Sequence, residues 1–357
     1  MTLSEISNLR IKNQQIEGLM HRSPKEIVSW FGAMQAQDFT MAKWAIGLRV
    51  LNSTEKTIEE AYNNGDILRT HLMRPTWHFV AADDINWMLE LTAHRIKQQM
   101  NSNNKRLEMT DLIYSKSNKI IEKQLVECKN LTREELTEAL KIEKINTNEN
   151  RLSHILMRAE LDRIICSGPL KGKKLTYSLL ADRVNSIKTL NKDEALAELA
   201  KRYFTSHSPA TLRDFIWWSG LSVANARHAL ELVKSNFISE TINSETYWVT
   251  NSISMNKYSN PSIHLLPAFD EFLIGYTNRE AALKLVDNRK IISENGIFRP
   301  TIVAQGQVIG LWKKLAKKNK VMIELNLFQA YEDNIKIESE IIRYETYLNN
   351  KVELTIK

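Results

Sequence analysis

Two glutamines separated by one residue and followed directly by an aspartate are the side chains whose types and spacing best fit a catalytic role. They form the segment Gln35-Ala36-Gln37-Asp38, which follows an apolar amphipathic stretch. Because a carboxamide does not titrate usefully, neither Gln35 nor Gln37 can serve as a general base. Fixed amide dipoles can instead place a water molecule and stabilise developing positive charge, and Asp38 would add negative potential. The alternative is that both amides cap a helix end or bond to loop backbone.

A run of basic, aromatic and hydroxyl side chains follows downstream, from Arg69 to His78. The candidates within it are His71, Arg74 and His78, because such side chains can contact phosphate or line a channel. On an exposed hairpin they can equally be solvated without any specific partner. We therefore treat them as possible site-lining residues.

The elements that must position these residues follow a repeated order, which is clearest in the middle of the chain. Apolar spacing predicts helices over residues 114–128 and 150–165, and Thr132 with Glu135 forms a capping box that opens a short helix between them. Residues 166–177 contain Gly-Pro and Gly-Lys turns, which indicate a β-hairpin with a basic tip. This order is a helix-turn-helix followed by a wing.

The same order returns before and after this copy. The third copy is predicted to have helices over residues 192–204, 210–218 and 222–234, then a hairpin over residues 237–250 with its turn at Asn243-Ser244. In the first copy, Ser23 and Pro24 match an N-cap and a first helical position, and residues 66–81 would form the wing.

After Pro261 the pattern changes to short runs with strand character, at residues 262–266, 301–305, 321–327, 335–337 and 347–355. The lysine-rich segment 313–320 is expected to be a solvated helix face or turn. The sequence thus predicts an α+β fold of three tandem winged-helix (helix-turn-helix plus wing) units followed by a C-terminal β-barrel or sheet domain. The predicted boundaries are 1–100, 101–188, 189–258 and 259–357.

Seven dispersed fragments in a fixed order carry a family resemblance. They are Met34-Gln35-Ala36-Gln37-Asp38, Arg74-Pro75-Thr76-Trp77-His78, Ser167-Gly168-Pro169, Tyr203-Phe204-Thr205-Ser206-His207-Ser208-Pro209-Ala210, Trp218-Ser219-Gly220-Leu221, Leu265-Leu266-Pro267-Ala268-Phe269-Asp270-Glu271 and Gly296-Ile297-Phe298-Arg299-Pro300-Thr301. Over nearly its whole length the chain resembles the AlkZ-like winged-helix DNA glycosylases, a family of alkylpurine and crosslink DNA glycosylases. The resemblance implies three winged helices and a β-barrel around a concave DNA-binding channel. It also implies a catalytic signature of Gln, an apolar residue, then Gln or Asp, which Gln35 and Gln37 match.

The chemistry of such an enzyme suits two neutral amides. Alkylation at N7 or N3 makes a purine cationic and therefore a good leaving group, so no strong general acid is needed. The remaining task is to place a water near C1′ and stabilise an oxocarbenium-like sugar. Gln37 would orient the water through its carbonyl, and Gln35 would brace the water or the sugar. We expect a monofunctional glycosylase of base excision repair without cofactor or metal, acting on alkylated purines and extending to bulky adducts or interstrand crosslinks.

Other residues are candidates for contacts to DNA. Lys171, Lys173 and Lys174 are expected at an exposed wing tip, where lysines neutralise phosphates. Arg69 is a further basic candidate, and His207-Ser208 precedes a helix whose N-terminus can hold a phosphate, although plain capping by Ser208 explains that segment equally well. Adjacent Asp270 and Glu271 face apart in a strand or turn, so a joint acid/base role is doubtful, and Asp270 is retained as a possible site-lining residue.

Composition narrows the class of protein. The 357 residues carry a net charge of +7 with a pI near 9.1, which mildly favours a polyanionic partner. Two distant cysteines match neither a zinc site nor a disulfide framework, and no apolar run has the length of a membrane span. We expect a cytoplasmic monomer that associates with the nucleoid when bound to double-stranded DNA containing alkylated bases. The alternative function is a non-catalytic winged-helix DNA-binding protein or transcription regulator.

Overall fold

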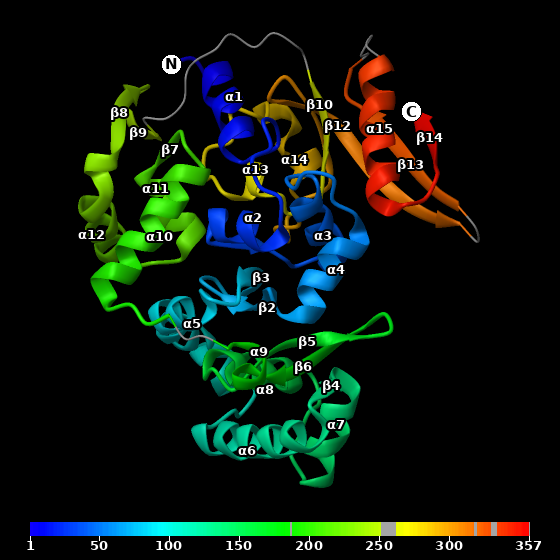
Figure 1. The fold of residues 1–357 in the computed structure, drawn as a ribbon. Coiled ribbons are helices and arrows are strands. Elements are labelled where there is room, and N and C mark those ends of the chain that lie inside the picture. Colours follow the sequence, from blue (N-terminus) through cyan, green and yellow to red (C-terminus); the bar gives the residue numbers. More distant parts are fainter. Residues whose placement is uncertain (186–187, 251–261, 318–319, 330–333, 357) are drawn as a thin grey trace.

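The computed structural model describes residues 1–185, 188–250, 262–317, 320–329 and 334–356 (Figure 1). Four sheets, three of three strands and one of five, are present among these residues, and helices accompany each of them. The protein is therefore of the α+β class. Along the chain, the three small sheets come first and the five-stranded sheet comes last.

The first repeat places a strand before two helices and a hairpin after them. Its elements are α1 (Leu3–Asn13), α2 (Pro24–Phe31), β1 (Ala33–Gln35), α3 (Phe39–Gly47), α4 (Glu55–Asn64), β2 (Ile67–Leu72) and β3 (Thr76–Ala81). The strands lie antiparallel in the order β1-β3-β2. Ser23 caps α2 in a capping box with Glu26, and Pro24 occupies the first turn as predicted.

The second and third repeats have the same strand order. The second contains α5 (Ile85–Arg106), α6 (Asp111–Cys128), β4 (Asn130–Thr132), α7 (Arg133–Ile142), α8 (Arg151–Leu161), β5 (Ile165–Lys171), β6 (Lys174–Leu179) and α9 (Leu180–Arg183). The third contains α10 (Lys192–Ser206), β7 (Ala210–Thr211), α11 (Leu212–Ser219), α12 (Val223–Val233), β8 (Phe237–Ile242) and β9 (Glu245–Thr250). Their sheets are ordered β4-β6-β5 and β7-β9-β8. The boundary predicted at residue 100 falls inside the continuous helix α5.

The junction between the first strand and the next helix differs between the repeats. In the second and third repeats the last strand residue, Thr132 or Thr211, is itself the N-cap of the helix and forms a capping box. In the first repeat the strand ends at Gln35 and the cap is Asp38. Two residues, Ala36 and Gln37, are thus inserted between strand and helix at this junction alone.

The C-terminal part is an open sheet in the order β10 (Ile263–Leu266), β11 (Thr301–Ala304), β12 (Gln307–Lys317), β13 (Lys320–Leu327) and β14 (Val352–Ile356). Neighbouring strands are antiparallel except for the parallel pair β13 and β14. The helices α13 (Glu271–Ile274), α14 (Asn288–Ile291) and α15 (Asn334–Leu348) accompany this sheet.

Two predictions for this region are wrong. Residues 335–337 and the start of 347–355 were predicted as strands but lie in α15, where the buried residues Ile337, Ile341 and Tyr344 recur at helical spacing. The lysine-rich segment was predicted as a helix face or turn but belongs to strands β12 and β13, except for residues 318 and 319, which lie outside the described residues. Lysine has a long apolar stem and a charged end, so it fits an exposed hairpin as well as an exposed helix. The lysine-rich composition therefore did not indicate a strand.

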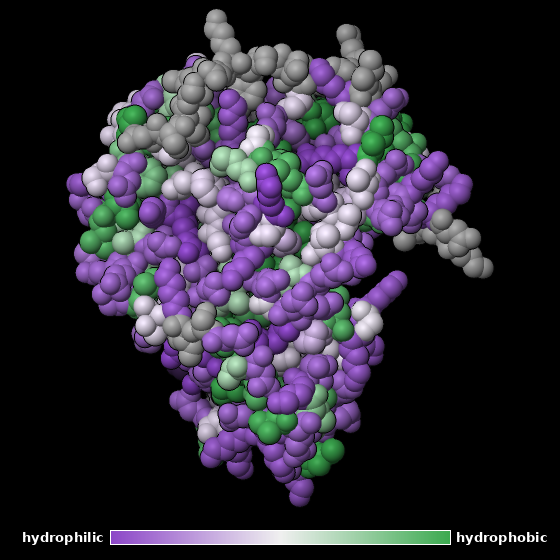
Figure 2. All heavy atoms as spheres, viewed as in Figure 1, coloured by the Kyte–Doolittle hydropathy of each residue, from purple (hydrophilic) through white to green (hydrophobic). Residues whose placement is uncertain are grey.

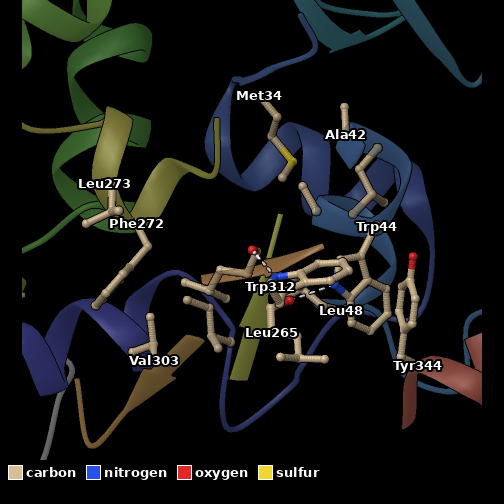
Figure 3. Close-up of a cluster of buried hydrophobic side chains, with 14 of the residues drawn as sticks. Met34, Ala42, Trp44, Leu48, Leu265, Phe272, Leu273, Val303, Trp312 and Tyr344 are labelled. Carbon is tan, nitrogen blue, oxygen red and sulfur yellow. Dashed lines mark hydrogen bonds between the residues drawn. The ribbon is translucent and has the colours of Figure 1, made fainter. Parts of the chain in front are cut away.

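A shared hydrophobic core joins the first repeat to the C-terminal sheet (Figure 3). In it, the Trp44 Nε1–H group donates to the carbonyl of Leu265 at 2.7 Å, and the Trp312 Nε1–H group donates to the carbonyl of Leu266 at 2.7 Å. Tyr344 of α15 packs edge-on against both indole rings. The indoles bury large apolar areas while their polar atoms stay paired, which ties the two parts firmly together.

The surface is mostly polar. Figure 2 shows a hydrophilic face on which hydrophobic residues form small separate patches. Within the described ranges, no helix combines the length and the apolar character that crossing a bilayer requires.

One buried ion pair also crosses the junction of the first repeat with the C-terminal part. The guanidinium of Arg49 binds both carboxylate oxygens of Asp270, at 2.8 and 2.7 Å, and the arginine is fully buried. It also donates to the backbone carbonyls of Gln14 and Ala45. Asp270 in turn accepts from the Phe272 N–H group at the start of α13. This geometry satisfies both charges with hydrogen bonds, as a buried ion pair requires.

Replacing Arg49 with methionine should lower the free energy of unfolding by about 3–5 kcal/mol, because Asp270 would remain buried without its partner. Urea denaturation of the two proteins measures this difference. Lys56→Met, which breaks an ion pair with Glu60 between two exposed side chains, should change stability little and serves as the control. Equal stability of Arg49→Met and the wild type would show that the pair does not anchor the junction.

Candidate active site

Gln35 lies at the end of β1 with its side chain almost completely buried. Its carboxamide oxygen accepts hydrogen bonds from Arg74 Nη2 at 3.2 Å and from Thr76 Oγ1 at 3.4 Å. These two donors assign the oxygen and the nitrogen of the amide, because only the oxygen can accept. The NH₂ group of Gln35 is therefore the end left to meet a ligand.

The backbone of Gln35 is held from the opposite side of the chain. Its N–H group donates to Glu271 Oε1 at 2.7 Å, and Glu271 opens α13, a helix 236 positions away in sequence. Gln35 also pairs across the sheet with His78 of β3. The first glutamine is thus fixed both by its own repeat and by the C-terminal part.

Gln37 is exposed and continues the path of β1 beside β3. The Ala36 N–H group donates to the Trp77 carbonyl at 2.7 Å, and the Gln37 carboxamide oxygen accepts from the Trp77 N–H group at 3.4 Å. The second contact is long, so the Gln37 oxygen can exchange it for a water molecule at little cost.

Asp38 does not supply its carboxylate to the two glutamines. It is exposed and caps α3, where its Oδ1 accepts from the Met41 N–H group at 3.0 Å. An acidic N-cap interacts favourably with the helix dipole, so this role explains the residue fully.

Arg69 fixes the backbone of the two inserted residues. Its Nε donates to the Ala36 carbonyl at 2.9 Å and its Nη2 approaches the Gln37 carbonyl at 3.5 Å. The guanidinium lies 4.0 Å from the Trp77 ring centre, and the residue is only 8% exposed. Arg69 thus supports the glutamine segment, and its contact with DNA stays a prediction.

His71 links the first repeat to the second. Its Nδ1 lies 2.6 Å from Glu160 Oε2, and its backbone N–H group donates to the same oxygen at 2.9 Å. Its ring also packs 3.9 Å from the Trp77 ring centre. His71 thus orients the aromatic side chain that covers Arg69.

His78 and Arg74 each keep a buried nitrogen without a partner. His78 Nδ1 contacts the Thr76 carbonyl at 2.9 Å, while His78 Nε2 and Arg74 Nε have no hydrogen bond among the described residues. Burial lowers the pKa of His78 to about 3, so the ring is neutral and Nε2 is an acceptor. Arg74 also donates to the Gln35 amide oxygen through Nη2, and His78 pairs with Gln35 across the sheet, so both nitrogens belong to residues that adjoin Gln35.

The hairpin turn that carries Arg74 rests on the third repeat. A Cβ atom at Gly220, which ends α11 with φ at +67°, would lie 2.7 Å from the Met73 carbonyl oxygen. Only glycine permits this approach. Arg74 then lies with its guanidinium 5.3 Å from the Trp217 ring centre, so three parts of the chain converge on Gln35.

Asp270, His207 and Ser208 are not exposed to a ligand. Asp270 is occupied by Arg49, as described above. His207 and Ser208 are fully buried, with His207 Nε2 3.3 Å from Glu271 Oε2 and the Ser208 hydroxyl accepting from the Thr250 N–H group. All three side chains are thus enclosed by the protein, and the DNA contacts of His207 and Ser208 and the site-lining role of Asp270 stay predictions.

The lysines of the second hairpin lie at its exposed tip. Lys171 pairs with Glu135 at 2.6 Å and Lys174 approaches Glu134 at 4.0 Å. Lys173 is exposed and has no ion-pair partner in the described part of the chain. The acidic first turn of α7 thus balances part of this charge.

Known proteins of one family are similar to this chain over most of its length. A family model described as DNA glycosylase AlkZ-like matches residues 28–347. The chain belongs to the AlkZ-like DNA glycosylase family. It is 23% identical over 319 residues, 85% of either protein, to an interstrand DNA cross-link repair glycosylase of Streptomyces sahachiroi. The solved structure of DNA glycosylase AlkZ from the same organism covers both chains completely with a TM-score of 0.82 and 20% identity, so the fold is shared.

The resemblance read from the seven fragments is confirmed, and the enzyme class predicted from it is that of the AlkZ-like family. Sequence reasoning singled out Gln35 and Gln37 in this AlkZ-like glycosylase, together with Arg69 and Arg74, but missed other residues that hold the two glutamines. Glu271, Thr76 and Trp77 all lie within the quoted fragments, so proximity to a family motif was the available signal. Glu160 lies in none of them, because its contact with His71 arises only when two repeats meet.

The neutral state of His78 in this AlkZ-like glycosylase has a consequence for stability. Its pKa in the folded protein, about 3, lies below the 6.5 of a free histidine. Between these values the unfolded chain binds one more proton, so the free energy of unfolding should fall as the pH is lowered from about 6.5 toward 3. In His78→Asn, whose amide can still donate to the Thr76 carbonyl, the decline should be shallower by up to about 1.4 kcal/mol per pH unit.

Urea denaturation of both proteins between about pH 7 and pH 5 measures the two slopes. The other histidines are common to both proteins and cancel in the difference. Identical slopes would mean that His78 takes up its proton in the folded state.

Proposed function

We propose that this AlkZ-like glycosylase hydrolyses the N-glycosidic bond of cationic N7- or N3-alkylated purines in double-stranded DNA, as a monofunctional enzyme of base excision repair. The observation that carries this proposal is the paired amide site. Gln35 is locked by Arg74, Thr76 and Glu271, while Gln37 stands exposed two residues further along. One amide is fixed in advance and the other is free to take a water, as catalysis by positioned dipoles requires.

The proposed reaction proceeds by breaking the bond from C1′ to the purine nitrogen. Both electrons of that bond go to the purine, which leaves as a neutral alkylated base because it was cationic before. The sugar becomes an oxocarbenium ion, and a water held by the Gln37 carbonyl adds to C1′ and loses its proton to solvent. Gln35 braces this water or the sugar through its NH₂ group. No group of the protein needs to donate a proton to the base.

We propose crosslinked and bulky adducts as further substrates. The support is the curated relative, whose name describes repair of interstrand DNA cross-links. A damaged base on a crosslink cannot leave the duplex freely. A site built on exposed Gln37 rather than in a closed pocket is compatible with such a base.

The three repeats are proposed to be winged-helix units that bind DNA and are followed by a C-terminal domain; the predicted boundaries at 188 and 258 are kept, and the boundary predicted at residue 100 moves to the start of α5 at Ile85. The shared strand order and the helix pair before each hairpin support this assignment. We propose that the enzyme acts as a monomer, since the three units lie in one chain. The alternative, a non-catalytic DNA-binding protein or regulator, accounts neither for the locked Gln35 amide nor for the family.

Gln37→Ala should slow single-turnover release of 7-methylguanine on the order of 10²-fold or more, because the water loses its orienting carbonyl. DNA affinity should barely change. Gln35→Ala should have a similar or milder effect, because the Gln35 amide supports the water or the sugar without orienting the attacking oxygen. Gel-based assays of base release from a duplex with one lesion measure these rates.

Chemical probes accompany these variants. Borohydride should trap no covalent protein–DNA adduct, EDTA should leave the rate unchanged, and a uracil duplex should not be processed since a neutral base needs a general acid. Full activity of the Gln35→Ala, Gln37→Ala double variant would overturn the mechanism.

The second hairpin provides a test of phosphate binding. Lys173→Ala should weaken binding to damaged and undamaged duplex alike and reduce the salt slope by about 0.9, the value for one phosphate contact. Lys171→Ala and Lys174→Ala should have smaller effects, since both ammonium groups already face the acidic turn of α7.

Glu135→Gln is the matched control, because glutamine preserves the capping box while it releases Lys171. Its affinity for DNA should increase, as measured by fluorescence anisotropy over a range of salt concentrations. Unchanged affinity and salt slope in every variant would show that this hairpin does not lie on DNA.

A further inference from the structure

Two adjacent buried carboxylates open α13, and the protein surrounds them in opposite ways. Asp270 is 4% exposed and is neutralised by the bidentate Arg49 guanidinium. Glu271 is 2% exposed, yet none of the described lysines or arginines lies within ion-pair distance of it. The two residues share their burial and differ in their charge balance.

Three uncharged N–H donors hold the Glu271 carboxylate. Oε1 accepts from the Gln35 backbone at 2.7 Å, and Oε2 accepts from Trp218 Nε1 at 3.0 Å and from His207 Nε2 at 3.3 Å. Burial alone raises the pKa of Glu271, but the interactions with His207 and the hydrogen bond from Gln35 outweigh it and the pKa lies below the ordinary value. Burial also lowers the pKa of His207, so the pair consists of a carboxylate and a neutral imidazole.

An anion buried among neutral donors is costly compared with a paired one. Asp270, the residue before Glu271, shows that this fold can supply a buried arginine where a carboxylate serves structure alone. The cation that interacts with Glu271 across Gln35 is Arg74, and its guanidinium is committed to the Gln35 amide oxygen and the face of Trp217. Glu271 therefore projects a negative potential toward the Gln35 amide.

We propose that Glu271 is the positioning residue of the active site, and that its carboxylate fixes Gln35 and supplies the negative charge that stabilises the cationic sugar. This inference rests on the proposed function. The carboxylate does not touch the substrate; it acts through the peptide N–H group of Gln35 and through the field that it adds at the amide. The potential favours the oxocarbenium ion over a neutral sugar, so the residue lowers the barrier to bond cleavage.

Two substitutions separate the effect of the Glu271 charge from the effect of its side-chain length. Glu271→Gln keeps the length and the acceptor for the Gln35 N–H group but removes the charge. Glu271→Asp keeps the charge but shortens the side chain by one methylene, so the bond to Gln35 is lost or lengthened. Glu340→Gln is the matched control, because Glu340 is also a buried carboxylate that accepts a backbone N–H group, that of Leu265, and lies on α15.

The first readout is affinity for two uncleavable duplexes. One carries a cationic pyrrolidine in place of the sugar and the other a neutral tetrahydrofuran. The wild type and Glu340→Gln should prefer the pyrrolidine duplex, and Glu271→Gln should lose roughly 10- to 100-fold of that preference while binding the tetrahydrofuran duplex normally. A purely structural role would weaken both duplexes equally.

The second readout is single-turnover release of 7-methylguanine. Glu271→Gln should slow release by a similar factor, and Glu271→Asp should slow it while retaining the preference for the pyrrolidine duplex. If the wild type releases the base but Glu271→Gln keeps the full preference for the pyrrolidine duplex, this inference alone is overturned. A wild type that neither releases the base nor distinguishes the two duplexes would overturn the proposed function itself.

Discussion

The hydrogen bond from the Gln35 backbone to Glu271 is the contact on which the proposed site depends. It joins the last residue of β1 to the first turn of α13, two segments that no local interaction brings together. The bond is short and charge-assisted, and both residues are buried, so it holds the strand end in one position. The Gln35 amide then has two further donors, Arg74 and Thr76, from the facing hairpin.

The parts around this contact are rigid because each is tied to its neighbour by buried polar groups as well as by apolar packing. Arg49 and Asp270 connect the first repeat to α13, and the Trp44 and Trp312 indoles connect it to the C-terminal sheet. Gly220 lets the Arg74 turn approach the third repeat. A preorganised amide requires such support, because a shift of about 1 Å already costs much of the benefit of positioning.

The three repeats show how one supersecondary pattern acquires different tasks. Thr132 and Thr211 cap their helices directly from the strand, whereas the first repeat inserts Ala36 and Gln37 before its cap, Asp38. The insertion lifts Gln37 into solvent beside β3 while Arg69 holds the backbone below it. A change of two residues at one junction thus separates a repeat that carries the signature from two that carry none.

Local patterns in the sequence determined several helices, caps and hairpins of the repeats and singled out the two glutamines, because caps and periodicity act within a few residues. They failed for α15 and for β12, where the C-terminal sheet decides which residues are buried. They assigned Arg69, His207 and Asp270 to ligands without indicating that all three are buried, since type and spacing do not reveal exposure. Only the tertiary structure decided that Asp270 pairs with Arg49 while Glu271 turns to Gln35, because both outcomes depend on partners more than two hundred positions away.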